Sequence, residues 1–283
     1  MKKILVLMLL ICFISLLYGC DKEEDLGHIN IQVVADTGIE IALGGIDRTP
    51  ASYKWVTTLT TTSFNQTIKD LYPEGFSFRE LTSPDGKVFF QLGVDQMVEV
   101  TQGYLEILIH FRSNQPNSII LGNFALDSFG ENWTSDVDFT DSKNNQILAG
   151  DDLYLILADA LRFSLSTDQD TYVFEKPIDG TNTHIGKITS YDTENLRGSA
   201  SYFYAKTQTL PMFMTSFDLP EMTFLEEYPT ILELQAVDSN VFGADYYGSV
   251  RLRLWFELLD LESYQTTLDQ KMELSLLFGT AMT

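Results

Sequence analysis

The sequence predicts an all-β protein: an antiparallel β-sandwich, jelly-roll-like, with short helices and long polar loops. Three observations support this fold class. Short segments of alternating apolar and polar residues recur from Ile29 to the C-terminus, separated by turn residues. The 13 tyrosines and 19 phenylalanines favour strands over helices. Nothing resembles a βαβ unit, a solenoid repeat or a linker rich in Pro and Ser.

The first half of the chain contains a run of predicted strands, at residues 29–33, 39–43, 56–64, 76–81, 88–92, 97–100, 104–111 and 119–121. The Thr-rich segment 56–64 suits a pleated, half-exposed surface. The Pro-Asp-Gly turn within residues 83–86 predicts that its flanking segments form a β-hairpin. Both faces of 104–111 are apolar, as in a strand that is covered on each side. One helical turn is expected at 66–71.

The second half resumes this rhythm around two long polar excursions, 132–150 and 179–198. Its predicted strands are residues 153–157, 161–166, 172–174, 201–204, 212–217, 231–237, 250–258 and 272–278. The clearest is 250–258, where every second residue from Val250 is apolar and Arg251, Arg253, Trp255 and Glu257 line the other face. Asp260 is expected to cap a short helix.

Residues 1–19 have the organisation of a signal peptide. Lys2 and Lys3 form a positive head, and the apolar run at 4–17 is broken only by Ser15. A membrane-spanning helix needs about twenty apolar residues, so this run has instead the length of a signal-peptide h-region. We therefore expect these residues to direct export and to be removed.

The segment ends in Leu17-Tyr18-Gly19-Cys20, which resembles the lipobox of bacterial lipoproteins. The resemblance implies a diacylglycerol on the Cys20 sulfur, cleavage before Cys20 and acylation of the new amino terminus. Two or three acyl chains anchor a protein stably, whereas one binds a membrane only marginally. The expected location is the extracytoplasmic face of the cell membrane, at the cell surface.

Residues 20–28 then form the acylated cysteine and an acidic tether. The run Asp-Lys-Glu-Glu-Asp at 21–25 cannot pack, and anionic lipid repels it, which suits a flexible spacer. It also resembles the acidic export signal of surface lipoproteins in the Bacteroidetes group, and an aspartate beside the cysteine resembles the inner-membrane retention signal of enterobacteria. The sequence does not separate these alternatives, so the type of cell envelope stays open.

Composition excludes several classes of function. Removing residues 1–19 takes away two lysines and no acid, which leaves 16 basic and 40 acidic residues and a net charge near −24. Nucleic acid is a poor partner for such a chain, because phosphate binding needs a basic surface. Cys12 leaves with the signal peptide and Cys20 is acylated, so no disulfide, zinc-cysteine site or thiol nucleophile is available. Residues 29–283 must fold by their core alone, as one sandwich domain or two packed sub-domains.

Three short segments resemble secreted Firmicutes β-sandwich proteins of the camelysin and TasA kind. They are Phe111-Arg112-Ser113, residues 158–164 leading into Tyr172 and Phe174, and Arg253-Leu254-Trp255-Phe256-Glu257 with Asp260 nearby. In that family the last segment reads close to Ile-Trp-Leu-Glu-Gly-x-Asp, and here Leu258 stands in place of the Gly. The resemblance covers about a quarter of the chain. It implies a jelly-roll-like sandwich and a surface or matrix component rather than an enzyme.

Asp136, Asp138 and Asp141 form a candidate calcium site in the loop after Trp133, because three hard oxygen ligands lie close together in sequence. Their spacing departs from the EF-hand pattern and no Gly occupies the turn position, so the alternative is a solvated acidic loop. No other cofactor is expected.

Trp133 and Trp255 are candidate ligand-binding residues, since exposed aromatic rings stack on sugars. Trp255 faces away from the apolar stripe of its strand, although a second covering layer would bury it. No catalytic residue is predicted. None of His28, His110 and His184 lies in H-E-x-x-H, and no Ser lies in G-x-S-x-G. His110 is expected to be a packed or surface histidine.

The sequence therefore predicts a non-enzymatic, lipid-anchored lipoprotein with a structural, adhesive or matrix role, whose edge strands pair with other subunits. The alternative is a glycan- or peptide-binding lipoprotein with a groove on one sheet face. A surface hydrolase with a carboxylate pair is a third alternative, for which the chain nominates no particular pair. The expected partners are the membrane, through the lipid, and further copies, matrix or glycan.

Overall fold

A computed structural model describes residues 29–36, 38–45, 52–94, 96–141, 143–176, 196, 198–211, 230–264 and 271–281. The signal peptide, Cys20 and the acidic tether lie outside these residues. So do His28, His184, the predicted strand at 212–217 and most of the polar excursion at 179–198.

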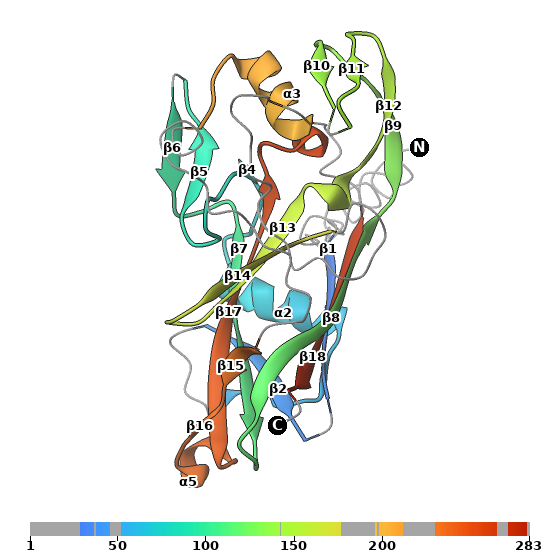
Figure 1. Cartoon of the computed structure of the whole chain (residues 1–283). Helices are drawn as coiled ribbons and strands as arrows, with labels where there is room; N and C mark the ends of the chain where they lie inside the picture. The colour runs from blue at the N-terminus through green and yellow to red at the C-terminus, as the bar shows by residue number, and fades with distance from the viewer. Residues whose placement is uncertain are drawn as a thin grey trace, which may run out of the picture.

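The all-β prediction is confirmed: the molecule is built from two main sheets, drawn in Figure 1. The five-stranded sheet contains, in order, β15 (Thr230–Glu233), β8 (Ser118–Ser128), β18 (Met272–Thr280), β1 (Ile29–Ala35) and β3 (Thr58–Leu59). The seven-stranded sheet contains β14 (Thr171–Glu175), β13 (Leu161–Ser166), β17 (Tyr246–Glu257), β7 (Leu105–Ser113) and β2 (Glu40–Gly44), and both β16 (Gln235–Ala236) and β4 (Glu80–Leu81) also pair with β17. Most neighbours are antiparallel, but β1 runs parallel to β18 and β4 parallel to β17.

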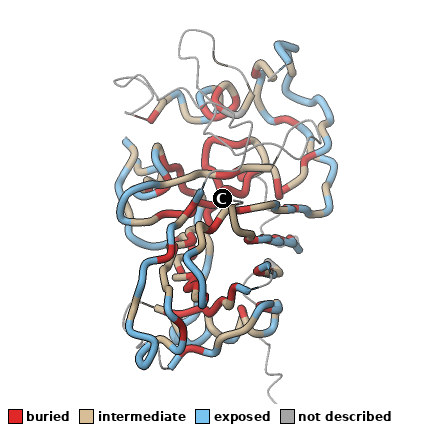
Figure 2. The backbone as a smooth tube through the Cα atoms, turned by 60° about the horizontal axis from the view of Figure 1, so that its bottom comes forward, coloured by how far each residue is buried: buried red, intermediate tan, exposed pale blue. Residues whose placement is uncertain are grey.

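The core lies between the two sheets. One continuous cluster of buried side chains contains Leu274 and Leu276 of β18 together with Val250, Leu252 and Leu254 of β17. These residues alternate along their strands, so burying one face of each strand removes the apolar stripe from water. Figure 2 shows the buried residues concentrated inside the molecule and the exposed ones on its outer turns.

The predicted strand at 56–64 is wrong beyond Leu59, because helix α2 (Thr61–Leu71) begins there. The Thr60 side chain accepts the backbone N–H of Ser63 and so caps the helix. Phe64 and Ile68, one turn apart, are fully buried in the core. The helix contacts β1 of one sheet and β2 of the other, and it therefore closes that side of the sandwich.

Beyond the sandwich, the polar excursion at 132–150 forms strands as well. Its strands are β9 (Gly130–Thr134), β10 (Phe139–Thr140) and β11 (Gln146–Ile147). β10 pairs with β11, and β9 pairs with β12 (Asp152–Ile156), the strand predicted at 153–157. The predicted strand at 201–204 is wrong, since these residues belong to helix α3 (Gly198–Thr207). Its Phe203 packs with Leu258 and Leu259, just after β17. That buried contact decides the helix, against the strand propensity of its aromatic residues.

The remaining elements are β5 (Phe89–Leu92), β6 (Met97–Val100), α5 (Ser239–Phe242) and the 3-10 helices η2 (Leu157–Asp159) and η3 (Leu261–Tyr264). The segments on either side of residues 83–86 were predicted to pair as a hairpin, but β5 pairs with β6 instead. The predicted pairing is limited to one bridge, between Thr82 and Phe90. A short helix does follow Asp260, as predicted. The Asp260 backbone carbonyl accepts the Ser263 N–H, whereas the Asp260 carboxylate, which was expected to cap the helix, pairs with Arg162.

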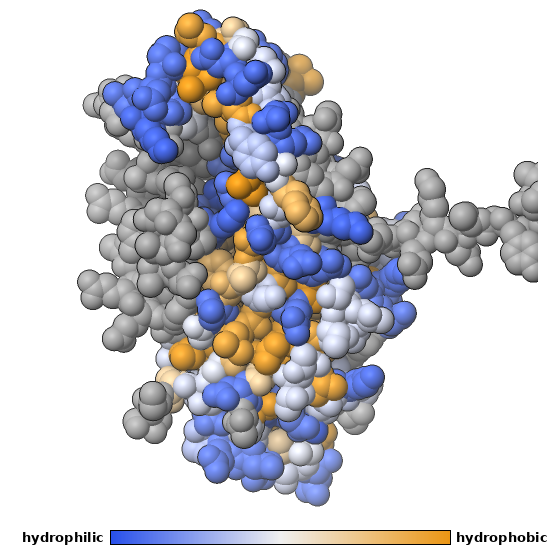
Figure 3. All heavy atoms as spheres, turned by 90° about the vertical axis from the view of Figure 1, so that its right-hand side faces the viewer, coloured by the Kyte–Doolittle hydropathy of each residue, from blue (hydrophilic) through white to orange (hydrophobic). Residues whose placement is uncertain are grey.

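The side that carries the five-stranded sheet and the β9–β12 ribbon shows hydrophobic residues interspersed with hydrophilic ones (Figure 3). In the described part of the chain, no helix is long and apolar enough to cross a membrane.

Candidate ligand-binding groove

The outer face of the seven-stranded sheet carries polar and charged side chains and is covered at both ends. At one end Phe89 packs edge-on against Trp255, with ring centroids 5.2 Å apart. At the other end Tyr53 stacks on His110 at 4.1 Å. Between these covers lies an open groove of about 1030 Å³. This groove is large enough for a ligand of several residues, since ordinary ligand pockets measure about 300–1,000 Å³.

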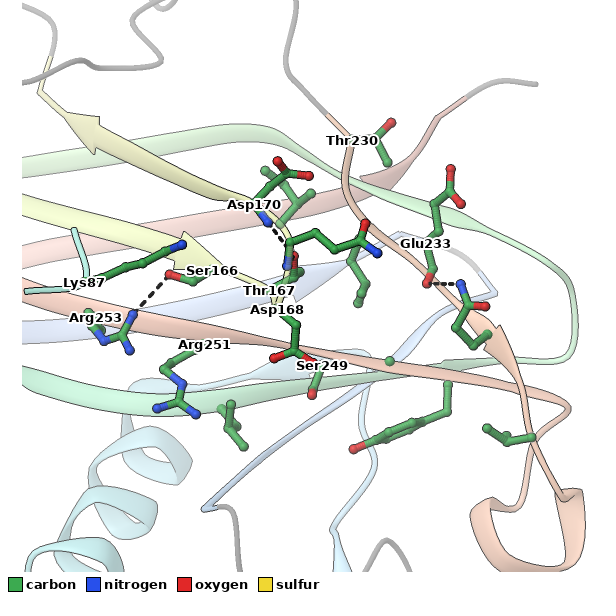
Figure 4. A pocket seen from close by; sticks show the side chains of 18 residues that line it. Lys87, Ser166, Thr167, Asp168, Asp170, Thr230, Glu233, Ser249, Arg251 and Arg253 are labelled. Carbon is green, nitrogen blue, oxygen red and sulfur yellow. Dashed lines mark hydrogen bonds between the residues drawn. The ribbon is translucent and has the colours of Figure 1, made fainter. Parts of the chain in front are cut away.

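Two sheets contribute to the groove, as Figure 4 shows from close by. Ser249, Arg251 and Arg253 of β17 and Ser166 of β13 line it from the seven-stranded sheet. The turn at residues 167–170, between β13 and β14, also lines it, as do β15 and the start of β16. Because β14 and β15 are edge strands of their sheets, the groove lies on the side of the sandwich away from α2.

Local hydrogen bonds hold the turn at 167–170. The Thr167 hydroxyl accepts the N–H of Gln169 at 3.3 Å and that of Asp170 at 3.1 Å. The Thr167 N–H also donates to the Asp170 carbonyl at 2.9 Å. Hydroxyl-to-backbone bonds of this kind stabilise tight turns. Asp168 and Asp170 are consequently exposed beside the groove.

A second turn, at residues 83–88, places Lys87. The Ser83 hydroxyl accepts the Gly86 N–H at 2.8 Å and donates to the Val88 carbonyl at 2.7 Å. Gly86 has a positive φ of 70°, which glycine adopts without strain. Its carbonyl accepts the Ser164 hydroxyl of β13 at 2.8 Å. The turn is therefore fixed to the sheet, and Lys87 follows it directly.

Glu106 of β7 holds both groove arginines. Arg253 lies opposite Glu106 in the β7–β17 register and donates Nε to its Oε2 at 2.7 Å. Arg251 is two residues away on the same face and donates Nη1 to Oε1 at 2.9 Å. Arg253 Nη1 also donates to Ser166 Oγ at 3.1 Å. Charge-assisted bonds of this kind fix the orientation of both guanidinium groups.

The groove is charged with opposite signs in two places. Lys87, Arg251 and Arg253 form what we call the cationic end. The anionic wall contains Asp168, Asp170 and Glu233. Figure 4 shows Lys87 and the arginines together at one end, with Glu233 and Thr230 toward the other.

Two backbone segments that border the groove have a side without a strand partner among the described residues. β15 is the edge strand of its sheet and pairs there only with β8. The other segment is in β17. On one side of this strand, β13 pairs with residues 251–256 and β16 pairs with residues 246–247. Residues 248–250 between them have no described strand on that side. Unpaired strand edges are templates for an added strand.

The aromatic end of the sheet is closed. His110 Nδ1 lies 2.6 Å from the Tyr247 hydroxyl, and burial lowers the pKa of His110 to about 4. Burial also raises the pKa of Tyr247 to about 12. At neutral pH the pair is therefore uncharged. His110 is only 2% exposed, so of the two expected positions, packed or at the surface, it occupies the packed one.

A buried charge cluster lies beyond the other end. Arg162 pairs with Glu175 at 2.9 Å and with Asp260 at 2.5 Å, and it donates to the Asp159 carbonyl. Glu257 is 1% exposed, and burial, reinforced by Asp260, raises its pKa to about 7. These groups tie β13 and β14 to the turn after β17.

The three candidate calcium ligands do not come together. Asp136 pairs with Lys206 and accepts the Tyr202 hydroxyl at 3.2 Å, and the Lys206 contact lowers its pKa. Asp138 accepts the Ala149 N–H at 2.7 Å. Asp141 accepts the N–H groups of Lys143 and Asn145. Over the residues that the structure describes, no three His, Cys, Asp or Glu side chains gather as a metal group. The described loop therefore offers calcium no site built from these three aspartates.

The two candidate tryptophans are packed rather than free to stack on a ligand. Trp255 is completely buried, because the Phe89 and Tyr104 side chains cover its face of the sheet. Trp133 is partly buried and packs edge-on against Tyr202 of α3 at 5.4 Å. Neither lines the groove.

Sequence reasoning identified no residue of the groove as functional. The available signal was the pair Arg251 and Arg253 on one face of a strand in a strongly acidic chain. Their partner Glu106 lies far away in sequence and is brought close only by the β7–β17 register.

Comparisons of this chain with protein families, with curated proteins and with solved structures found no match.

Proposed function

We propose that this protein is a lipid-anchored, extracytoplasmic binding protein that holds an extended segment of another protein chain in the groove. It serves a structural or adhesive role at the cell surface and carries out no chemical step. The observation that carries the proposal is the groove itself, bordered by the edge strand β15 and by residues 248–250 of β17. A peptide that pairs with β15 extends the five-stranded sheet by β-augmentation.

A peptide suits this groove better than a glycan. Among the described residues that line it, Tyr247 is the one aromatic residue, and its hydroxyl is engaged with His110. Sugar-binding sites usually offer an open aromatic face, and the described lining has none that is free. The backbone edge and the charges of both signs are instead matched by an extended peptide with charged side chains.

The test uses the full chain in detergent and an array of short synthetic peptides rich in β-branched residues, in acidic, neutral and basic versions. Ser249→Tyr places a large side chain inside the groove, and Gln169→Trp obstructs it from the exposed turn without changing the charge. Ser275→Tyr makes the same change as the first variant on the exposed face of β18 and serves as the control. Urea unfolding checks that each variant is folded.

We expect folded Ser249→Tyr and Gln169→Trp proteins to lose peptide binding, while Ser275→Tyr keeps it. Peptide binding that survives both groove variants would contradict the proposal. So would a protein that binds no peptide of any charge but binds a glycan array.

A further inference from the structure

The cationic end of the groove stands out against the rest of the chain. The protein has 40 acidic and 18 basic residues, yet three of the basic ones meet here. Glu106 provides one negative charge against Arg251 and Arg253, and Lys87 adds a further positive charge. The cationic end thus keeps an excess of two positive charges on a molecule that is anionic overall. An anionic group of a ligand is attracted here and repelled over most of the remaining surface.

The two arginines have different parts in this arrangement. Arg253 has an 11% exposed side chain and is held by Glu106 and Ser166 together. Arg251 has a 32% exposed side chain and donates Nη1 to Glu106. Its Nε and Nη2 have no partner among the described residues of the groove, and they are held in a fixed orientation by the bond at Nη1. A guanidinium held in this way is prepared for a carboxylate, which accepts two parallel N–H bonds.

Lys87 approaches the same end from the other side. Its turn is fixed to β13 through the bond between Ser164 and the Gly86 carbonyl, and its side chain is exposed beside Ser166 (Figure 4). Arg251 supplies a planar donor pair, and Lys87 supplies a compact charge. The anionic wall lies farther along the groove than Arg251 and Lys87. A ligand carboxylate placed beside the anionic wall is disfavoured, because like charges repel.

We propose that Arg251 and Lys87 form a carboxylate-binding subsite that selects an acidic segment of the bound peptide, with Glu106 and Arg253 as positioning residues. This inference rests on the proposed function, because it names the ligand chemistry of the same groove. The carboxylate comes from an Asp or Glu side chain or from a free peptide C-terminus, and both present the same two oxygens to Arg251.

The experiment measures the affinity of the full chain for four matched peptides. The first peptide carries an internal Glu and has an amidated C-terminus. The second is identical except that Gln replaces the Glu. The third is the Gln peptide with a free C-terminus, and the last carries an internal Lys. Arg251→Gln and Lys87→Gln remove the two charges and keep a polar, unbranched side chain. Arg79→Gln and Lys271→Gln, at exposed positions outside the groove, are the matched controls.

We expect a peptide with a carboxylate to bind about tenfold or more tightly than the neutral peptide, as for a charge-assisted hydrogen bond. Arg251→Gln and Lys87→Gln each reduce this preference, salt weakens it, and both controls keep it. The Glu peptide and the free C-terminus peptide distinguish the two sources of the carboxylate. Equal binding of all four peptides, or tighter binding of the Lys peptide, would overturn the subsite while leaving peptide binding in place. Binding of none of them by the unaltered protein would instead refute the proposed function.

Discussion

At the residue scale, Arg162 is a buried side chain with several charged and polar partners. It joins Glu175 of β14 and Asp260 after β17, and it donates to the backbone carbonyl of Asp159. Its side chain is only 7% exposed, so the surrounding carboxylates depend on it for their charge balance. Removing one partner of a buried ion pair leaves an uncompensated charge in a low-dielectric site.

We therefore expect Arg162→Met to lower the free energy of unfolding by about 3–5 kcal/mol. Lys176→Met is the control, because Lys176 pairs with the 45% exposed Asp159 and should cost about 1 kcal/mol or less. Urea unfolding of both variants measures the difference. Similar small losses in the two proteins would show that Arg162 is not a structural hub.

Two buried groups titrate with opposite consequences for stability. Burial raises the pKa of Glu257 from 4.5 to about 7, so the folded state keeps a proton that the unfolded state releases. This contribution lowers stability as pH rises from 4.5 to 7. Burial lowers the pKa of His110 from 6.5 to about 4, so the unfolded state takes up the proton first. That contribution lowers stability as pH falls from 6.5 to 4, and the two effects offset each other in the wild type.

Single variants should reveal each effect. Glu257→Gln should gain up to about 3 kcal/mol relative to wild type between pH 4.5 and pH 8, because it lacks the penalty of ionising a buried carboxyl group beside Asp260. His110→Phe should show the reverse trend and improve relative to wild type as pH falls to 4. Urea unfolding at a series of pH values tests both. Curves that run parallel to wild type would contradict the assigned pKa directions.

At the element scale, the strands with clean alternation were predictable, whereas the helices were predicted only in part. Residues of β7, β17 and β18 alternate around a buried face, and the sequence places them nearly correctly. In α2, the Thr-rich start favours a strand, so the sequence predicted only the turn at 66–71. The first half of the helix is indicated by Thr60 as a cap, with Phe64 and Ile68 spaced one turn apart. In α3, contacts of Phe203 with Leu258 and Leu259 decide the structure. No local pattern predicts those contacts.

The groove was beyond prediction from sequence for a related reason. The alternation along β17 predicted that Arg251 and Arg253 share its polar face. Glu106, Ser166 and Lys87 come from other elements, and their positions depend on strand registers and on the turn at 83–88. Trp255 lies on that same polar face but is buried, because the β5–β6 hairpin forms a second layer there.

The turn that positions Lys87 gives a prediction at this scale. A Cβ at Gly86 would lie 2.8 Å from Ser164 Cβ and 2.9 Å from Val173 Cγ2, in addition to the strain of φ +70°. At Gly150, φ is +101° but nothing lies within 4 Å of the added atom. Gly86→Ala should therefore cost more than Gly150→Ala, by about 1–3 kcal/mol of overpacking. Thermal and urea unfolding compare them, and equal losses would show that the turn is not tightly packed on β13.

At the scale of the whole molecule, the proposed anchor and groove belong to opposite parts of the chain. The anchor is expected at Cys20, whereas the groove is formed by residues from 87 onward. Because the expected processing leaves no free thiol, the fold must be stabilised by its core and by buried polar contacts such as those of Arg162.

Cells that express the full chain should incorporate a palmitate analogue into the wild type and not into Cys20→Ser. The mature wild-type protein should also be found in the membrane fraction, since an acylated terminus partitions into lipid. Gel fluorescence after labelling, together with fractionation, measures both. Equal labelling of the two proteins would remove the lipobox interpretation without affecting the groove.

The central claim is that a peptide occupies the groove and pairs with the edge of β15. Hydrogen–deuterium exchange of the full chain in detergent, with and without the acidic peptide, tests it most directly. We predict slower exchange in Thr230–Glu233 and at residues 248–250 on binding, since their backbone groups gain partners. We also predict no change in β18 beyond the groove. Protection confined to other strands, or none at all with the peptide bound, would contradict binding in this groove.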